Sequence, residues 1–109
     1  RVFSNQQKAL ASSALGVLKE GGEMIYSTCT HAPEENEVVI QYLFDNFNIE
    51  LLPIKLPLKT REGLSEWKGE RFNSELKKCA RIYPQDNNTE GFFLCKIKKL
   101  NDEKKRESK

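Results

Sequence analysis

The sequence predicts an α/β fold, because helices and strands alternate along its first half with short connections between them. Helix, strand, helix, strand is an order typical of parallel strands joined by right-handed crossovers. Two further strand candidates follow near the end of the chain. Two strands alone do not make a stable sheet, so we expect further sheet to come from elsewhere. The length of 109 residues permits at most one small domain with a modest core.

The first expected element is an amphipathic helix over residues 4–19. Its apolar residues recur at the spacing of one helix face, namely Leu10, Ala11, Ala14, Leu15 and Leu18. Ser4 with Gln7 matches a capping box at its start. Lys19 and the Gly21-Gly22 pair supply a usual stop.

A short apolar segment after these glycines, residues 23–26, predicts a buried strand. The polar turn Ser27-Thr28-Cys29-Thr30 follows it directly. A second helix is expected from Pro33, since proline is accepted at a first helical position. Glu34, Glu35 and Glu37 then face the positive end of the helix dipole.

The second helix is expected to end near residues 46–48, where a strand over residues 49–52 begins and runs to Pro53. Residues 53–78 show no periodicity and predict a long irregular segment of the kind that is functional or mobile. Residues 80–84 and 91–98 predict two strands that can pair as a hairpin across a turn-rich link.

Charge and cysteine content narrow the class of protein. A net charge of +2 is too small to indicate a polyanion partner by itself. No apolar run reaches the roughly 20 residues that a membrane span needs, so we expect a soluble protein without membrane contact. Three cysteines without metal-ligand spacing disfavour a disulfide framework and a metal site, and they fit a reducing, cytoplasmic setting. Residues 100–109 predict a charged, flexible tail, or else a contact with phosphate.

Candidate chemistry concentrates at Cys29. In open α/β sheets ligands bind beyond the carboxyl ends of the strands, and the turn at residues 27–30 lies at such an end. A thiolate is a strong nucleophile that the start of the following helix favours, whereas Glu34 and Glu35 oppose it. The pattern alone leaves Cys29 either reactive or an inert small residue at a strand end.

The run from Gly21 to Glu37, GGEMIYSTCTHAPEENE, closely resembles a segment of RNA cytosine-C5 methyltransferases of the Sun/RsmB/Nop type, which reads GG-x-hydrophobic-hydrophobic-YSTCT-x-x-PEENE. Arg81-Ile82-Tyr83-Pro84 and Thr89 to Phe93 are similar to the closing strands of that family. The resemblance covers most of residues 4–99. His31 and Ala32 depart from it, because the family usually has a large aliphatic residue and often a polar one there.

The resemblance implies the C-terminal part of a catalytic domain over residues 1–99, the later part of a doubly wound Rossmann-like methyltransferase sheet ending in an antiparallel closing strand. It implies S-adenosylmethionine as cofactor and tRNA or rRNA as partner. The family's Gly-rich cofactor turn and its Asp-Ala-Pro-Cys segment are absent from this sequence. We therefore expect the cofactor site to lie mostly outside this chain, in a remainder of the domain upstream, and the 109 residues alone to be inactive.

The implied mechanism makes Cys29 the catalytic nucleophile. Its thiolate adds to C6 of a cytosine that has left its stack, C5 is methylated, and elimination releases 5-methylcytosine. Thr28 and Thr30 would bind the substrate ring, or else only satisfy a turn. The alternative is a non-catalytic fragment or partner-dependent RNA-binding module.

Other residues admit less specific interpretations. His31 is read as a surface loop residue rather than a partner of Cys29, and Cys79 with Cys95 as buried strand residues. The carboxylates of Glu34, Glu35 and Glu37 are explained by helix capping before acid-base chemistry. Trp67 either anchors its loop or stacks on an RNA base with Arg61, Lys68 and Arg71 nearby.

Overall fold

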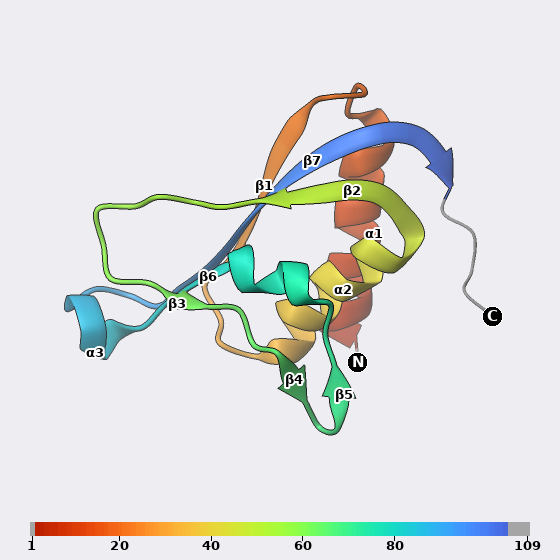
Figure 1. The fold of residues 1–109 in the computed structure, drawn as a ribbon. Helices are drawn as coiled ribbons and strands as arrows, with labels where there is room; N and C mark the ends of the chain where they lie inside the picture. Colours follow the sequence, from red (N-terminus) through yellow and green to blue (C-terminus); the bar gives the residue numbers. More distant parts are fainter. Residues whose placement is uncertain (1, 105–109) are drawn as a thin grey trace.

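Two helices lie on one side of a curved antiparallel sheet in the computed structural model, which describes residues 2–104 (Figure 1). The main elements in chain order are α1 (Val2–Val17), β1 (Glu23–Thr28), α2 (Glu37–Asn46), β2 (Phe47–Leu52), β6 (Ala80–Ile82) and β7 (Phe92–Lys104). A 3-10 turn, η1 (Pro33–Glu35), precedes α2. The helix, strand, helix, strand order and the closing strand pair predicted from the sequence are thus confirmed.

Strand β7 is the centre of the sheet. β1 pairs with it antiparallel from Glu23↔Lys98 to Thr28↔Phe93. On its other side β7 pairs antiparallel with β2 and with β6. β1 and β2 therefore run in the same direction, as expected of a right-handed crossover, but β7 lies between them and they are not neighbours. Within residues 2–104, β1 is the end strand of the sheet, with its other edge unpaired.

The core lies between β7 and the two helices. Alternate residues of β7, namely Phe93, Cys95, Ile97 and Lys99, are buried on the face that meets α1 and α2. Opposite them pack Ala11 and Leu15 of α1 and Val39, Ile40 and Leu43 of α2, and beside them in the sheet Ile49 and Leu51 of β2 join the same core. Buried residues thus recur every second position along the strand and every third or fourth position along the helices. The apolar pattern of the sequence predicted both spacings.

Both ends of α1 differ from the prediction. The helix includes Val2, so Ser4 lies within it and the capping box is wrong. The buried hydroxyl of Ser4 instead donates to the carbonyl oxygen of Glu34, 2.7 Å away. At the other end, buried Lys99 of β7 donates from Nζ to the carbonyl oxygens of Leu15 and Leu18, at 2.8 and 2.7 Å. A cation therefore caps the negative helix end, but it comes from a distant strand.

The segment between β2 and β6 is largely irregular, as predicted. It contains the two-residue strands β3 (Arg61–Glu62), β4 (Glu66–Trp67) and β5 (Glu70–Arg71), and the 3-10 turn η2 (Ser74–Lys78). Leu76 of η2 is fully buried and joins the core. A short helix, α3 (Pro84–Asn87), occupies the predicted turn-rich link. β7 continues past residue 99, where the tail was expected to begin, to Lys104, and the rest of that tail, residues 105–109, lies outside the described residues.

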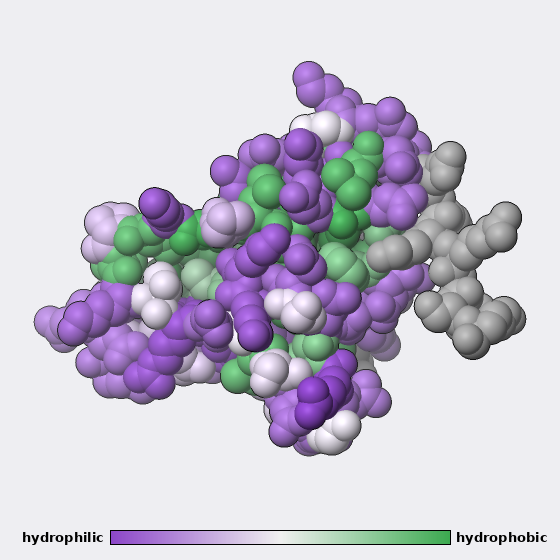
Figure 2. Space-filling model, in the orientation of Figure 1, coloured by the Kyte–Doolittle hydropathy of each residue, from purple (hydrophilic) through white to green (hydrophobic). Residues whose placement is uncertain are grey.

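The face seen in Figure 2 is mostly hydrophilic, with separate hydrophobic patches. The predicted strand at residues 23–26 is less buried than expected, because only Tyr26 of these four residues is buried. Ile25 is 53% exposed beside the unpaired edge of β1. None of the helices between residues 2 and 104 is long and apolar enough to cross a membrane.

Candidate active site around Cys29

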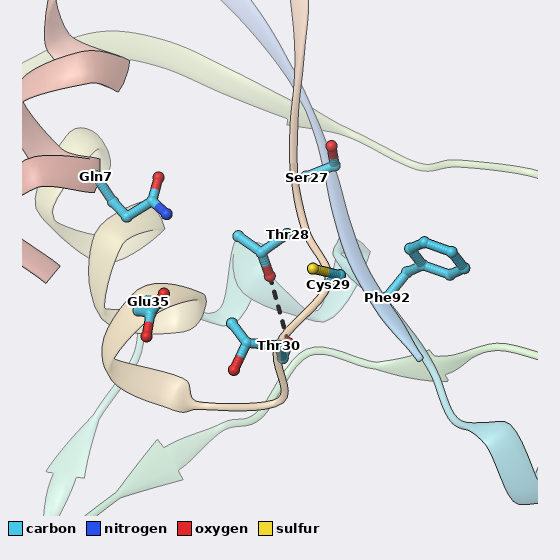
Figure 3. A pocket seen from close by; sticks show the side chains of 7 residues that line it. All are labelled: Gln7, Ser27, Thr28, Cys29, Thr30, Glu35 and Phe92. Atoms are coloured by element: carbon cyan, nitrogen blue, oxygen red, sulfur yellow. Dashed lines mark hydrogen bonds between the residues drawn. The ribbon is translucent and has the colours of Figure 1, made fainter. Parts of the chain in front are cut away.

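Cys29 directly follows the end of β1 and is exposed. It lines a pocket of about 420 Å³ together with Gln7, Ser27, Thr28, Thr30, Glu35 and Phe92. Figure 3 shows the side chain of Gln7 extending from α1 toward this loop, while Ser27 and Phe92 lie on the other side of Cys29. The predicted placement of Cys29 beyond a strand end is therefore what the chain adopts, and an accessible thiol stands beside a cavity.

Asn36 ties down the residues on both sides of Cys29. The Thr28 hydroxyl donates to Oδ1 of Asn36 at 2.6 Å, and Nδ2 of Asn36 donates to the carbonyl oxygen of Thr30 at 2.9 Å. The Thr30 hydroxyl oxygen accepts a bond from the backbone N–H of Ala32 at 3.1 Å. Asn36 itself is fully buried, so the loop that contains Cys29 is hydrogen-bonded to a polar side chain of the protein interior.

A buried ion pair lies next to this amide. Arg81 of β6 donates from Nε and NH2 to the two carboxylate oxygens of Glu37, both at 2.6 Å. Both residues are almost inaccessible to solvent. Burial disfavours the charged form of Arg81, but its hydrogen bonds to Glu37 prevail, and the pKa of the guanidinium is raised. Such a bidentate pair positions its partners as well as neutralising them.

The ion pair also makes hydrogen bonds to the Cys29 loop, which joins β1 to η1, and to the irregular segment between β2 and β6. Arg81 donates from NH1 to the carbonyl oxygen of His31 at 3.2 Å, and Glu37 accepts the N–H of Leu64 at 2.9 Å. The interpretation of Glu37 as a capping carboxylate is therefore incomplete, because it stands in the first turn of α2 but serves Arg81. Glu35 lines the Cys29 pocket, and its carbonyl oxygen accepts the hydroxyl of Tyr26 at 2.6 Å.

His31 is exposed, and its ring packs on Tyr83, with the ring centroids 4.8 Å apart. A β-carbon at Gly91 would stand 2.2 Å from Nε2 of His31, so the absence of a side chain there makes room for the imidazole. His31 is thus a surface loop residue as predicted, in contact with Tyr83.

The other two cysteines are buried, as predicted. Cys95 lies on the core face of β7, whereas Cys79 precedes β6 and is not itself in a strand. A hydrogen bond with Cys95, together with burial, raises the pKa of the Cys79 thiol. The Cys79 thiol is therefore held in the protonated, unreactive form.

Trp67 belongs to the hairpin formed by β4 and β5. The ammonium of Lys68 lies 4.6 Å from the centre of its indole ring. Trp67 lines a second pocket, of about 530 Å³, with Tyr42 of α2 and Phe72. Arg61 does not join this group, because its guanidinium stacks on Tyr83 and forms an ion pair with Asp86. The expected cluster of Trp67 with Arg61 is therefore not assembled.

Asn36 and Arg81 are the site residues that sequence reasoning missed. Both stand inside the motifs that carried the family resemblance, but no periodicity or spacing marks either as a partner of the loop. Arg81 is 44 residues from Glu37 in the sequence. No group of three or more His, Cys, Asp and Glu residues with the arrangement of a metal site occurs within residues 2–104.

Comparisons with known proteins find relatives over most of this chain. Residues 1–98 match the sequence profile of the family described as 16S rRNA methyltransferase RsmB/F. A tRNA (cytosine(49)-C(5))-methyltransferase of Pyrococcus abyssi is 47% identical over 96 residues, which are 88% of this chain and 31% of the relative. A human 28S rRNA (cytosine(4447)-C(5))-methyltransferase is 36% identical over 100 residues, 88% of this chain and 12% of the relative.

Solved structures give the same result. The crystal structure of a methyltransferase homologue from Pyrococcus horikoshii has a TM-score of 0.84 at 43% identity and covers 91% of this chain and 32% of its own. NSun6 from the same organism has a TM-score of 0.68 at 29% identity over 91% of this chain and 23% of its own. The later part of a Rossmann-like methyltransferase sheet, ending in an antiparallel strand, is thereby confirmed. The chain spans about a third of the first of these relatives.

Proposed function

This chain belongs to the 16S rRNA methyltransferase RsmB/F family, and we propose that the protein containing it methylates C5 of a cytosine in RNA through a covalent adduct with Cys29. The observation that carries the proposal is the environment of this one thiol. Cys29 is exposed beside a pocket, whereas Cys79 and Cys95 are buried. Of these three thiols, only that of Cys29 can reach a base without unfolding.

The chemistry requires a nucleophile of this kind. C5 of cytosine is a poor nucleophile until a group adds covalently at C6. The Cys29 thiolate supplies the electron pair for the C6–S bond, and the electrons displaced from the ring make C5 reactive. After C5 has gained its methyl group and lost its proton, the C6–S bond breaks and its electron pair returns to sulfur. The target base has to leave its stack to reach Cys29.

We further propose that Thr28 and Thr30 contribute to the substrate site. Both line the pocket with Cys29. The Thr30 hydroxyl oxygen accepts a bond from Ala32, which leaves its hydrogen available to donate to an acceptor on the base. The Thr28 hydroxyl donates to Asn36, so Thr28 acts mainly by shaping the wall of the pocket.

S-adenosylmethionine is the methyl donor that the family implies, and it would supply the methyl group that C5 takes. The described residues do not fit a complete site for it. The pocket beside Cys29 has one carboxylate, that of Glu35, and no glycine-rich turn that would let the backbone approach a nucleoside. We propose that the cofactor binds mostly to other parts of the protein.

The proposal includes both tRNA and rRNA as possible substrate classes. The relatives named above act on tRNA and on rRNA, and either substrate is compatible with a small pocket around one cytosine. Three free cysteines suit a reducing compartment, so we propose that the protein acts in the cytoplasm.

Substituting Cys29 by alanine in the full protein tests the proposal. We expect Cys29→Ala to lower methyl transfer from labelled S-adenosylmethionine to RNA by at least about 10³-fold, because it removes the thiol that forms the adduct and the other two thiols of this chain are buried. Cys95→Ala is the matched control, since it removes a thiol that lies in the core. Bisulfite sequencing of RNA from a deletion strain identifies the cytosine. Turnover retained by Cys29→Ala would refute the role of Cys29, and a wild-type protein without turnover would favour a non-catalytic RNA-binding module.

A further inference from the structure

We infer that Asn36 is a positioning residue, which holds Cys29 in the geometry for attack by tying its two neighbours to one rigid side chain; this inference rests on the function proposed above. The carboxamide of Asn36 accepts from the residue before Cys29 and donates to the residue after it. A single planar group therefore spans the nucleophile on the inner side of the loop.

The anchor is rigid because Asn36 lies at the junction of η1 and α2. Its backbone N–H donates to Pro33, and its carbonyl oxygen accepts from Ile40, which is fully buried in the core. Asn36 itself is completely inaccessible to solvent. A side chain whose position is set by core packing is the kind of support that keeps a functional group within a fraction of an ångström of its productive place.

Asparagine suits this position because the contact needs an acceptor and a donor on one neutral group. Aspartate would bring an ionised carboxylate against the Thr30 carbonyl oxygen and close to the thiolate, where two negative charges repel. Serine and alanine are too short to reach both partners. A buried amide with both partners present costs little, whereas one with a partner removed leaves a polar group unpaired in the interior.

The Thr28 hydroxyl is the half of this contact that can be tested without disturbing Asn36. It donates to Asn36 at 2.6 Å and lies 3.3 Å from the carbonyl oxygen of Thr30. Thr28→Val keeps the shape of the side chain but removes the hydroxyl, whereas Thr28→Ser keeps the hydroxyl but removes a methyl group. A role in packing and a role in hydrogen bonding therefore predict opposite orders of activity.

The experiment measures kcat and KM for RNA in the full protein. We expect Asn36→Ala to lower kcat by about 10- to 100-fold, because displacement of a reacting group by about 1 Å costs about 10²-fold. KM should change by less than about threefold, because a side chain that only positions the nucleophile acts on the reacting step and not on RNA binding. Asn87→Ala is the matched control, because the Asn87 carboxamide also makes two bonds, to the N–H and carbonyl of Lys59, away from Cys29. Its kcat should equal that of wild type.

The Thr28 variants keep the inference falsifiable even where Asn36→Ala folds poorly. We expect kcat of Thr28→Val to fall by about 5- to 30-fold and kcat of Thr28→Ser to fall less, because serine keeps the hydroxyl that bonds to Asn36. Where Asn36→Ala folds, Thr28→Val should cost little more on that background, because its partner is already gone.

Equal kcat for Asn36→Ala and Asn87→Ala, or a Thr28→Val enzyme at least as active as Thr28→Ser, would overturn the inference. Cys29→Ala separates this failure from failure of the proposed function. When Cys29→Ala is inactive and Asn36→Ala is fully active, only the positioning role is wrong. When Cys29→Ala is active, the assignment of Cys29 as the nucleophile is wrong.

Discussion

The Cys29 loop and the paired strands β6 and β7 place the same chemical group in opposite environments. Cys29 stands at the open end of β1 beside a pocket, while Cys95 faces the core of β7 and Cys79 lies buried next to it. A hydrogen bond with Cys95 and burial raise the pKa of the Cys79 thiol and keep it neutral. The sequence marks Cys29 as the candidate nucleophile by its place after a strand and by its motif, and the structure adds that Cys29 is exposed while the other two thiols are buried.

What holds the two regions also differs. The strand pair is fixed by its backbone ladder and by apolar packing of Phe93 and Ile97. The Cys29 loop has no strand partner beyond Thr28, and its anchors are polar side chains of the interior, Asn36 and Arg81. An exposed thiol that must stay in place therefore depends on a buried polar scaffold, which is sensitive to the loss of any one member.

Arg81 links the two regions, and its removal should have the largest effect on stability. Arg81→Met leaves the Glu37 carboxylate buried without its partner, which we expect to lower the free energy of unfolding by about 3–5 kcal/mol. The measurement is the denaturant midpoint of the full protein. The double variant Glu37→Leu/Arg81→Met should recover most of the loss, because neither charge of this ion pair then remains buried.

Arg61→Met is the matched control for Arg81→Met. It breaks the same type of ion pair, with Asp86, but the Arg61 side chain is 54% exposed. We expect no measurable change in its denaturant midpoint, because solvent screens such pairs. A loss as large as that of Arg81→Met would mean that burial does not decide the strength of these contacts.

Thiol alkylation tests the contrast between the cysteines directly. With iodoacetamide on the native protein, we expect Cys29 to react at least about 100-fold faster than Cys79 or Cys95, because the buried thiols react only after local opening. The raised pKa of Cys79 works in the same direction, since it lowers the fraction of thiolate at a given pH. Peptide mass spectrometry over time measures each rate, and similar rates would break the comparison.

Cys95→Ala should have a smaller effect on stability than Arg81→Met. Replacing this buried thiol removes one heavy atom from the core and should lower the free energy of unfolding by about 1–2 kcal/mol. Methyl transfer should stay within about twofold of wild type, because Cys95 does not line the pocket. A large loss of activity at unchanged stability would give Cys95 a role that its position does not explain.

Local patterns predict much of this fold. The apolar spacing of α1 and α2 and the short apolar runs of β1 and β2 place those elements within a few residues. The insertion of β7 between β1 and β2 follows from pairing between residues distant in the sequence, which no local pattern encodes. No local pattern encodes the cap at the C-terminal end of α1 either, because Lys99, which provides it, lies on a strand more than 80 residues away in the sequence.

The candidate site divides in the same way. Cys29, Thr28 and Thr30 are marked by their place after a strand and by the resemblance of their motif. The residues that hydrogen-bond to this loop are not marked in the sequence. Asn36 and Glu37 have the pattern of an ordinary helix start, and only the fold brings Arg81 beside them. The family motif thus predicts the candidate nucleophile, whereas the side chains that we propose to hold it are found only in the structure.

Trapping the adduct tests the central claim most directly. RNA carrying 5-fluorocytidine at the target position should form a lasting covalent complex with the full protein and S-adenosylmethionine, because fluorine at C5 cannot leave as a proton does. We expect mass spectrometry to find the nucleotide attached to the peptide that contains Cys29, and Cys29→Ala to form no complex. An adduct on any other residue, or an equal yield from Cys29→Ala, would contradict the account.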